Sequence, residues 1–398
     1  MPTFDTTSSL DTAAERSKGS GLSIAILALA GFVIVTTEFL IIGLLPAMSR
    51  DMGISISQAG LFVTLFAFVV MLFGPPLTAM LSHLDRKRTF VAILVLFAAS
   101  NALAAMAGNV WVMALARLLP ALALPVFWGT ASETAGMLAG PGREGKAVTQ
   151  VYFGISAAML LGIPMGTMFA DAVGWRGAFW ALTVMSLLMA LLLWVSMPHL
   201  APTAKVKLVK QVKTLANLHF ITQLLLSVAV FTAMFTAYTY LADTLERVAG
   251  VPSAQVGWWL MGFGAVGLVG NSLGGRFVDR NPMGATMGFA LLMGLAFIAA
   301  TPSSISLATF GGVLIVWGIA QNALFPVCQV RVMQAAPQAL ALAGTLNVSA
   351  ANAGIALGSV IGGVTIEQWG LTAVGYVAAL IVLLAIPMAI VISRHKPN

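Results

Sequence analysis

Long apolar stretches separated by short polar segments run along nearly the whole chain. A membrane-spanning helix needs about 20 apolar residues, because roughly 30 Å of hydrocarbon is crossed at 1.5 Å per residue. The stretches are continuous and do not alternate with polar residues, which favours helices over barrel strands. The pattern predicts twelve spans, at 22–48, 57–82, 89–108, 110–139, 147–171, 176–197, 218–245, 254–275, 283–301, 304–330, 339–366 and 370–392.

An internal repeat divides these spans into two halves. Gly162-Ile-Pro-Met-Gly166 in the fifth span recurs as Gly358-Ser-Val-Ile-Gly362 in the eleventh, 196 residues later. Asp85-Arg86 after the second span recurs as Asp279-Arg280 after the eighth, 194 residues later. Recurrence at matching positions indicates a duplicated six-helix unit, a plan common among transporters.

The sequence therefore predicts an all-α membrane protein with two pseudo-symmetric six-helix bundles. The bundles are expected at 22–197 and 218–393, joined by a polar linker at 198–217 on the cytoplasmic side. The polar segment 1–21, rich in Ser and Thr, is expected to be a disordered cytoplasmic tail and not a cleaved signal peptide.

Charge is scarce and unevenly distributed. Only 8% of the 398 residues are charged, against about a quarter in soluble domains, so most of the surface is expected to face lipid. With the N-terminus inside, sixteen Lys and Arg residues, Arg331 among them, fall on the cytoplasmic side, and three, Arg50, Arg176 and Arg247, fall outside. This bias predicts a multi-pass protein of the bacterial inner membrane with both termini cytoplasmic. The net charge of +7 thus reflects the orientation of the protein in the membrane and does not indicate a nucleic-acid-binding surface.

Few residues suit enzymatic or metal chemistry. Cys328 is the single cysteine, and the four histidines lie outside the spans or at their ends, without a cluster of acids or cysteines. We expect no metal, no cofactor and no enzymatic activity, since the spans contain no catalytic pair.

Glu38 stands out because it lies well inside the first span. A carboxylate at the bilayer centre costs on the order of 3 kcal/mol, and such residues generally carry function. Burial disfavours the ionised form of a carboxyl group. A carboxyl group that is neutral in an apolar environment and ionised in contact with water can therefore carry a proton. The alternative is a structural acid that locks the first span to a neighbour.

Arg117 is the other ionisable residue deep in a span. Counting residues from the helix ends puts Arg117 at a depth similar to that of Glu38, so the two are expected to meet. Arg117 would then stabilise ionised Glu38 or bind polar groups of the substrate. A permanent ion pair that only holds helices together is the alternative.

Several residues are candidates for gating. Glu133 lies near the cytoplasmic end of the fourth span and is expected to pair with the basic run Arg86-Lys-Arg88, either as a gate latch or as a static surface pair. Gly162, Pro164 and Gly166 are expected to bend the fifth span and to let a neighbouring helix approach closely. The remaining gating candidates are Asp85, Asp279 and Arg280.

Aromatic and amide side chains on apolar spans are candidates for the substrate site, because lipid-facing amides are costly and small-molecule pockets are largely apolar. Taken singly, each is better explained by packing between helices than by contact with a substrate. The candidates are Phe127, Trp128, Tyr238, Asn347 and Asn352.

Three motifs resemble those of one transporter family. Thr36-Thr-Glu-Phe39 with Gly43-Leu-Leu-Pro46 resembles the first helix of a sugar, purine-nucleoside and drug efflux branch. Arg117-Leu-Leu-Pro120 is similar to a fourth-span arginine associated with proton coupling, and Gly162-Ile-Pro-Met-Gly166 resembles the antiporter signature of the fifth span. On these residues, 22–393 resembles the major facilitator superfamily and, within it, the twelve-span drug:proton antiporters.

The loop signature of that family is carried better by the second half of the chain. Gly275-Arg-Phe-Val-Asp-Arg280 matches it, whereas Ala79 and His83 stand where the first copy normally has Gly and Asp. The resemblance implies proton-driven export of a small organic molecule by a monomer with no nucleic-acid partner. A proton-independent facilitator or importer, and a membrane receptor or scaffold that transports nothing, remain alternatives.

Overall fold

The computed structural model describes residues 6–81, 83–140, 144–198, 200, 218–301, 306–337 and 340–394. Within these residues, twelve helices are long and apolar enough to cross a membrane, which confirms the predicted number of spans. Almost all of the expected linker 198–217 lies outside the described residues, as do residues 1–5 of the expected tail.

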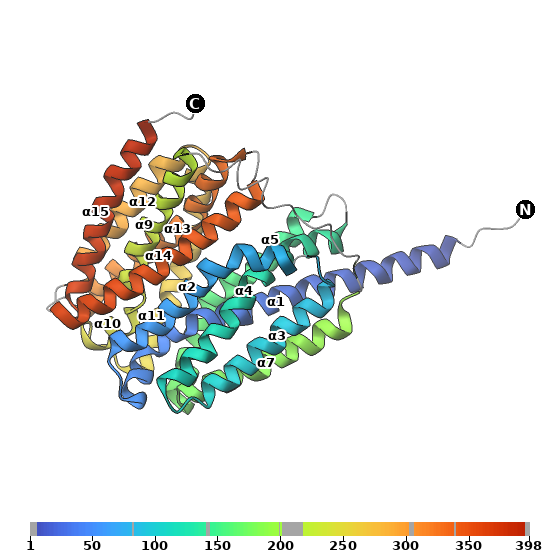
Figure 1. Cartoon of the computed structure of the whole chain (residues 1–398), viewed down its shortest axis with the longest axis horizontal. Coiled ribbons are helices and arrows are strands. Elements are labelled where there is room, and N and C mark those ends of the chain that lie inside the picture. The colour runs from blue at the N-terminus through green and yellow to red at the C-terminus, as the bar shows by residue number, and fades with distance from the viewer. Residues whose placement is uncertain are drawn as a thin grey trace, which may run out of the picture.

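The first six spans form the N-terminal bundle (Figure 1). The first four spans are α1 Thr6–Met52, α2 Ile56–Leu81, α3 Arg86–Ala105 and α4 Val110–Ala139. The fifth span consists of α5 Glu144–Ala157, the π-helical turn η1 Ala158–Gly162 and α6 Ile163–Val173, and the sixth is α7 Trp175–Ser196. Helix α1 begins at Thr6, so residues 6–20 of the segment that we expected to be disordered are helical.

The other six spans form the C-terminal bundle. Their elements are α9 Leu218–Tyr238 with α10 Leu241–Arg247, α11 Ser253–Val278, α12 Pro282–Ala299, α13 Leu307–Gln334, α14 Leu340–Trp369 and α15 Ala373–Arg394. The seventh span, predicted as one helix, is interrupted at Thr239 and Tyr240.

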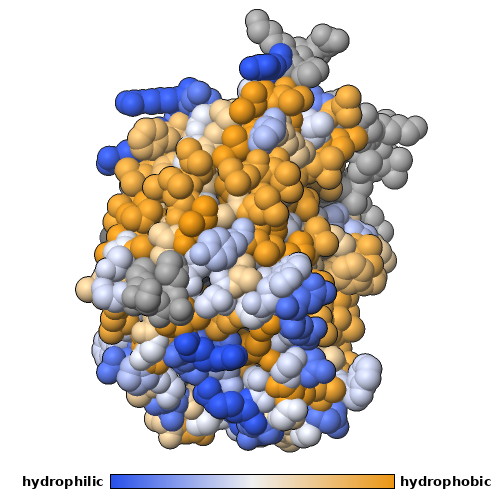
Figure 2. Space-filling model, turned by 90° about the vertical axis from the view of Figure 1, so that its left-hand side faces the viewer, coloured by the Kyte–Doolittle hydropathy of each residue, from blue (hydrophilic) through white to orange (hydrophobic). Residues whose placement is uncertain are grey.

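The surface matches a protein surrounded by lipid. In Figure 2 a broad hydrophobic area lies between hydrophilic groups at the top and in the lower part of the view. Arg50, Arg176 and Arg247 lie at one end of the helices, which we call the outer end because the charge bias predicts that it faces outside. The opposite end is the inner end.

One arginine was misplaced by the sequence pattern. Arg331 was counted among the cytoplasmic loop residues, but it lies inside α13 with 3% of its surface exposed. Its guanidinium donates to the side-chain oxygen of Gln223 and, at 2.9 Å, to Oγ of Ser227, both on α9. These acceptors satisfy a charge that the apolar pattern alone would exclude from a span.

The internal repeat appears in the packing of the two bundles. A Cβ at Gly162 would lie 2.1 Å from Oγ1 of Thr36 on α1, and a Cβ at Gly358 would lie 2.6 Å from the carbonyl oxygen of Thr232 on α9. Thr36 and Thr232 are themselves 196 residues apart. The same glycine-to-helix contact therefore occurs in both halves, as the spacing of the glycines predicted.

Helices α9 and α14 approach each other most closely at three glycines. A Cβ at Gly354, Gly358 or Gly362 would lie 2.5–2.6 Å from atoms of α9, which are backbone carbonyls in the case of Gly358 and Gly362. Because no side chain fits there, the two helices are in backbone-to-backbone contact over two turns.

The two bundles pack against each other through α2 and α14 and through α11 with η1 and α6, and a seam joins α1 to α9–α10. The rings of Phe39 and Phe235 are 6.1 Å apart, and Nη1 of Arg50 lies 2.7 Å from Oε2 of Glu246. In both pairs the partners are 196 residues apart, so equivalent helices of the repeat cross at the seam.

Polar contacts close the outer end. In the part of the chain that the structure describes, three polar contacts join the bundles: Arg50 to Glu246, Ser359 Oγ to the carbonyl of Gly60 at 2.8 Å, and Thr64 Oγ1 to the carbonyl of Ala356 at 3.5 Å. All three lie in the outer half of their helices. The bundles splay apart towards the inner end (Figure 1).

The contact between α11 and η1 makes a specific prediction for two nearby glycines. A Cβ at Gly264 would lie 2.7 Å from the carbonyl oxygen of Met159 and 2.8 Å from Cα of Leu160, whereas a Cβ at Gly262 meets nothing within 4 Å. Gly264→Ala is expected to destabilise the protein by about 1–3 kcal/mol through overpacking. Gly262→Ala, the matched control, is expected to be neutral or slightly stabilising because alanine favours the helix. Unfolding midpoints in detergent measure both, and equal midpoints would contradict the close packing of the two bundles.

Candidate functional site

Glu38 lies near the middle of the first span. It is 17 residues from Gly21 and 14 from Met52, which corresponds to about 26 Å and 21 Å along the helix. Between Val33 and Pro46 it is the one residue of α1 that is partly exposed. Its neighbours on the same helical face, Ile34, Val35, Ile41 and Ile42, are each at most 3% exposed. Glu38 therefore lies on a stretch of α1 that is packed inside the protein and does not face lipid.

Arg117 binds the same segment of α1 from α4. Its side chain is 1% exposed, donates from Nη1 to the carbonyl of Thr37 and from Nη2 to the carbonyl of Glu38, both at 2.8 Å, and lies 4.5 Å from the ring centre of Phe66. The two residues meet at one depth, as predicted. The contact, however, is to the backbone of Glu38, and no ion pair joins the two side chains among the described residues. The positive charge of Arg117 still acts on the Glu38 carboxyl group.

A small recess lies between the bundles on the C-terminal side of the seam. Four aromatic rings and two amides dominate its lining, which consists of Met159, Phe235, Tyr238, Phe263, Gly264, Gln321, Asn322 and Phe325. We call it the central recess. Phe235 also contacts Phe39, the residue that follows Glu38 in α1, so the recess borders the seam.

Internal contacts hold the walls of the central recess in place. Tyr238 stacks on Phe263 with ring centres 5.4 Å apart, and the indole Nε1–H of Trp317 donates to Oε1 of Gln321 at 2.7 Å. Asn322 donates to the carbonyl of Gly318 at 2.9 Å. Rings and amides that are fixed in this way suit the recognition of a compact molecule with both flat apolar and polar faces.

Of the five predicted substrate residues, the structure brings Tyr238 to the central recess and places the others elsewhere. Phe127 is fully buried in the N-terminal bundle, 5.5 Å from Phe90 and 5.2 Å from Trp128. Gly31 of α1 leaves room for Phe127 and Trp128, since a Cβ there would lie 2.9 Å from the Trp128 ring and 3.7 Å from the Phe127 ring. Asn347 donates to Gln329 at 2.7 Å and Asn352 to the carbonyl of Val348 at 3.0 Å, so both amides donate within the C-terminal bundle, and neither lines the central recess.

The predicted gating residues lie mainly at the inner end. Arg86, 1% exposed, pairs with Glu133 at 2.7 Å, which confirms the expected partner. Asp85 caps α3 by accepting from the backbone N–H of Arg88 at 2.8 Å.

The remaining gating candidates differ between the two halves. Asp279 and Arg280 are exposed, and their side chains form no hydrogen bond or ion pair with other described residues. Pro164 lies in the first turn of α6, just after η1, and Gly166 faces Leu40 of α1. The fifth span therefore changes its helical geometry at the signature, as the Gly and Pro pattern suggested.

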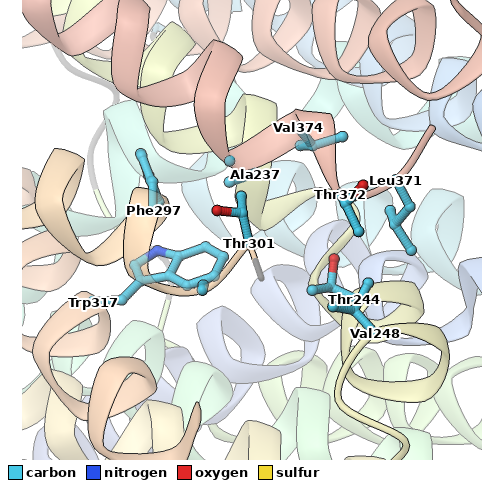
Figure 3. A pocket seen from close by; sticks show the side chains of 11 residues that line it. Ala237, Thr244, Val248, Phe297, Thr301, Trp317, Leu371, Thr372 and Val374 are labelled. Carbon is cyan, nitrogen blue, oxygen red and sulfur yellow. The ribbon is translucent and has the colours of Figure 1, made fainter. Parts of the chain in front are cut away.

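A second recess lies inside the C-terminal bundle towards the outer end (Figure 3). Thr244, Thr301 and Thr372 line it together with Trp317, the residue that also holds Gln321 at the central recess. Trp317 and Asp243, a buried acid on α10, were not among the residues predicted from the sequence. Asp243 was recognisable, since it falls within the predicted span 218–245.

Twelve membrane-crossing helices in two similar bundles, with a recess and ionisable groups between them, define a polytopic membrane transporter. The family model for the Major Facilitator Superfamily matches residues 27–347 and 250–398. The chain belongs to this superfamily. Its members are transporters and not enzymes, so this chain is a multi-pass inner-membrane transporter for a small-molecule substrate.

Individual relatives agree with this assignment. The chain is 31% identical over 375 residues to the inner membrane transport protein YdhP of Escherichia coli K12, covering 94% of this chain and 96% of the relative. It is 29% identical over 365 residues to YtbD, an uncharacterized MFS-type transporter of Bacillus subtilis, covering 90% and 92%. A crystal structure of a bacterial homologue of the human lysosomal transporter Spinster, inward-facing and unoccupied, superposes with a TM-score of 0.78 at 16% identity, covering 96% and 99%.

The geometry of Arg117 predicts that charge alone does not replace it. Arg117→Lys keeps the positive charge, but a single ammonium group does not reproduce the fork that reaches two carbonyls. We expect a loss of about 1.5–3 kcal/mol of stability, measured by unfolding in detergent. Arg276→Lys, on the exposed surface of α11, is the control and should leave the midpoint unchanged. Equal midpoints would show that the forked contact does not stabilise α1.

Proposed function

We propose that the protein exports a small organic molecule in exchange for protons by alternating access. One observation carries this proposal: Glu38 is an ionisable acid at mid-depth, on a helix of the seam, and it is partly exposed among neighbours on α1 that are buried. A static structural acid would be expected to be enclosed by partners, because an unpaired carboxylate in hydrocarbon is costly.

Arg117 supports the same role by positioning. It holds the carbonyls of Thr37 and Glu38, so its charge stays close to the carboxyl group without neutralising it in an ion pair. Glu38 therefore remains free to exchange a proton or to contact cargo. In the proposed cycle, protons that enter from outside neutralise Glu38 and favour release of cargo, and deprotonation on the inner side resets the site. About 2.3 kcal/mol per charge per 100 mV is available to drive it.

We further propose that cargo binds at the central recess. The ring of Phe235 in its lining contacts Phe39, the residue that follows Glu38 in α1, so cargo and proton would act on the same stretch of the seam. The recess is small while the outer contacts are closed. Loading therefore requires the bundles to separate at one end, which is what alternating access provides.

Glu38→Gln tests the coupling. Cargo is first identified by comparing growth of an overexpressing and a deletion strain across toxic compounds, where an exporter is expected to protect. In everted vesicles, Glu38→Gln is expected to abolish uphill transport driven by a pH gradient, because the amide carries no proton, while counterflow of labelled cargo continues. Asp171→Asn, an exposed acid on α6, is the control and should pump normally.

The same assay separates the alternatives. If Glu38→Gln still transports cargo uphill on a pH gradient, Glu38 does not couple transport to protons. Counterflow in the wild type without any proton movement would indicate a facilitator or importer. The absence of any cargo-dependent flux would indicate a receptor or scaffold.

Tyr238→Leu tests the proposed cargo site. Loss of the ring that stacks on Phe263 is expected to raise the KM for cargo by about five- to tenfold, since one stacked aromatic contact contributes roughly 1–1.5 kcal/mol. The matched control is Tyr376→Leu, which removes a lipid-exposed tyrosine from α15 and should leave the KM unchanged. An unchanged KM in Tyr238→Leu would place the cargo elsewhere.

A further inference from the structure

Asp243 is an acid that the proposed cycle leaves unused. Of the acids whose side chains the structure describes, it is the one that is buried, with 3% of its surface exposed. It lies on α10, beyond the interruption of the seventh span. Burial of a carboxylate at this position is costly unless the group has a partner or a function.

The partner of Asp243 is a weak one. Nη1 of Arg247 lies 3.3 Å from its Oδ2, and the arginine side chain is 62% exposed, so water competes for the cation. The other charges that act on Asp243 are those of Glu246, on its own helix, and Arg50, on α1. Helix α11, which also packs against α10, carries no ionisable residue in its outer half.

Asp243 lies on the same seam as Glu38, nearer the outer end. Residues 196 apart are neighbours across the seam, so Asp243 lies level with Ala47 of α1. Ala47 is nine residues beyond Glu38, which corresponds to about 14 Å along the helix. One turn inward from Asp243, the fully buried hydroxyl of Thr239 has no hydrogen-bond partner among the described residues. A polar group without a partner there leaves a donor and acceptor free between the two acids.

We propose that Asp243 is a second proton-binding carboxyl group, which takes up protons at the outer end before they reach Glu38. This inference rests on the proton exchange proposed above. When the Arg50–Glu246 contact opens, water at the outer end gives a proton to the Asp243 carboxylate, which then releases Arg247. The proton passes inward by way of the Thr239 hydroxyl and water to the Glu38 carboxylate. Asp243 returns to the ionised form and pairs with Arg247 again.

The proton itself is the probe in the first experiment. The full chain, labelled with ¹³C in the aspartate carboxyl groups and reconstituted in lipid, is titrated with acid while infrared spectroscopy follows the C=O band of protonated aspartic acid. We expect a band that is lost in Asp243→Asn and kept in Asp279→Asn, an exposed control. In Arg247→Gln, which keeps the carboxyl group but removes its cation, the band should appear at a higher pH. A titration that is identical in the wild type and in Asp243→Asn overturns the proposal.

The second experiment separates proton transfer from structure. In everted vesicles, with the labelled compound used for Glu38→Gln, Asp243→Asn is expected to lower uphill transport at least tenfold and to leave counterflow within twofold of the wild type. Asp243→Glu, which restores a carboxyl group, should recover most of the uphill rate. Equal losses of uphill transport and counterflow would mean that Asp243 is only structural.

The outcomes also separate the two proposals. If the wild type does not pump on a pH gradient, the proton exchange itself is wrong. If the wild type pumps, Glu38→Gln fails and Asp243→Asn pumps at the wild-type rate, only the role of Asp243 is wrong.

Discussion

In hydrocarbon, a polar or ionised side chain is stable only where the protein supplies its partners, and this constraint organises the molecule. Arg117 is held by carbonyls of α1, and Arg331 by Gln223 and Ser227 of α9. Both arginines thus bind the first helix of their own bundle and use neutral oxygen atoms to do so. Because these guanidinium groups bind neutral oxygen atoms, neither arginine forms an ion pair with an acid of the seam among the described residues.

At the seam, equivalent helices of the internal repeat lie against each other but carry different side chains. Helices α1 and α9–α10 are equivalent in the repeat and face each other with residues 196 apart as neighbours. Their sequences are nevertheless different: α1 contributes Glu38 and Arg50, and α10 contributes Asp243 and Glu246. In the proposed cycle the bundles would rock about this seam, and its different side chains on the two helices would give the motion a direction.

Much of this architecture could be predicted from the chain, and the reasons for success and failure are physical. Apolar runs predict spans because lipid sets their length, and the equal depth of Glu38 and Arg117 follows from counting residues. Arg331 was misplaced because a charge normally ends an apolar run, and its acceptors on α9 are remote in sequence. The surroundings of Phe127 and of Asn347 depend on how helices rotate about their axes, which hydropathy does not determine. Asp243 stood in the predicted span, but its burial depends on α1 and on the interruption at Tyr240.

The close approach of α9 and α14 at Gly354, Gly358 and Gly362 has a mechanical consequence. Two helices in backbone contact over two turns bend and tilt as a single lever, because no flexible side chain lies between them to absorb displacement. Tyr240, just beyond α9, also donates to the carbonyl of Ser359 on α14, so the two helices stay joined beyond the interruption of the seventh span. Any tilt of α14 would therefore also move Tyr238, which lines the central recess at the end of α9.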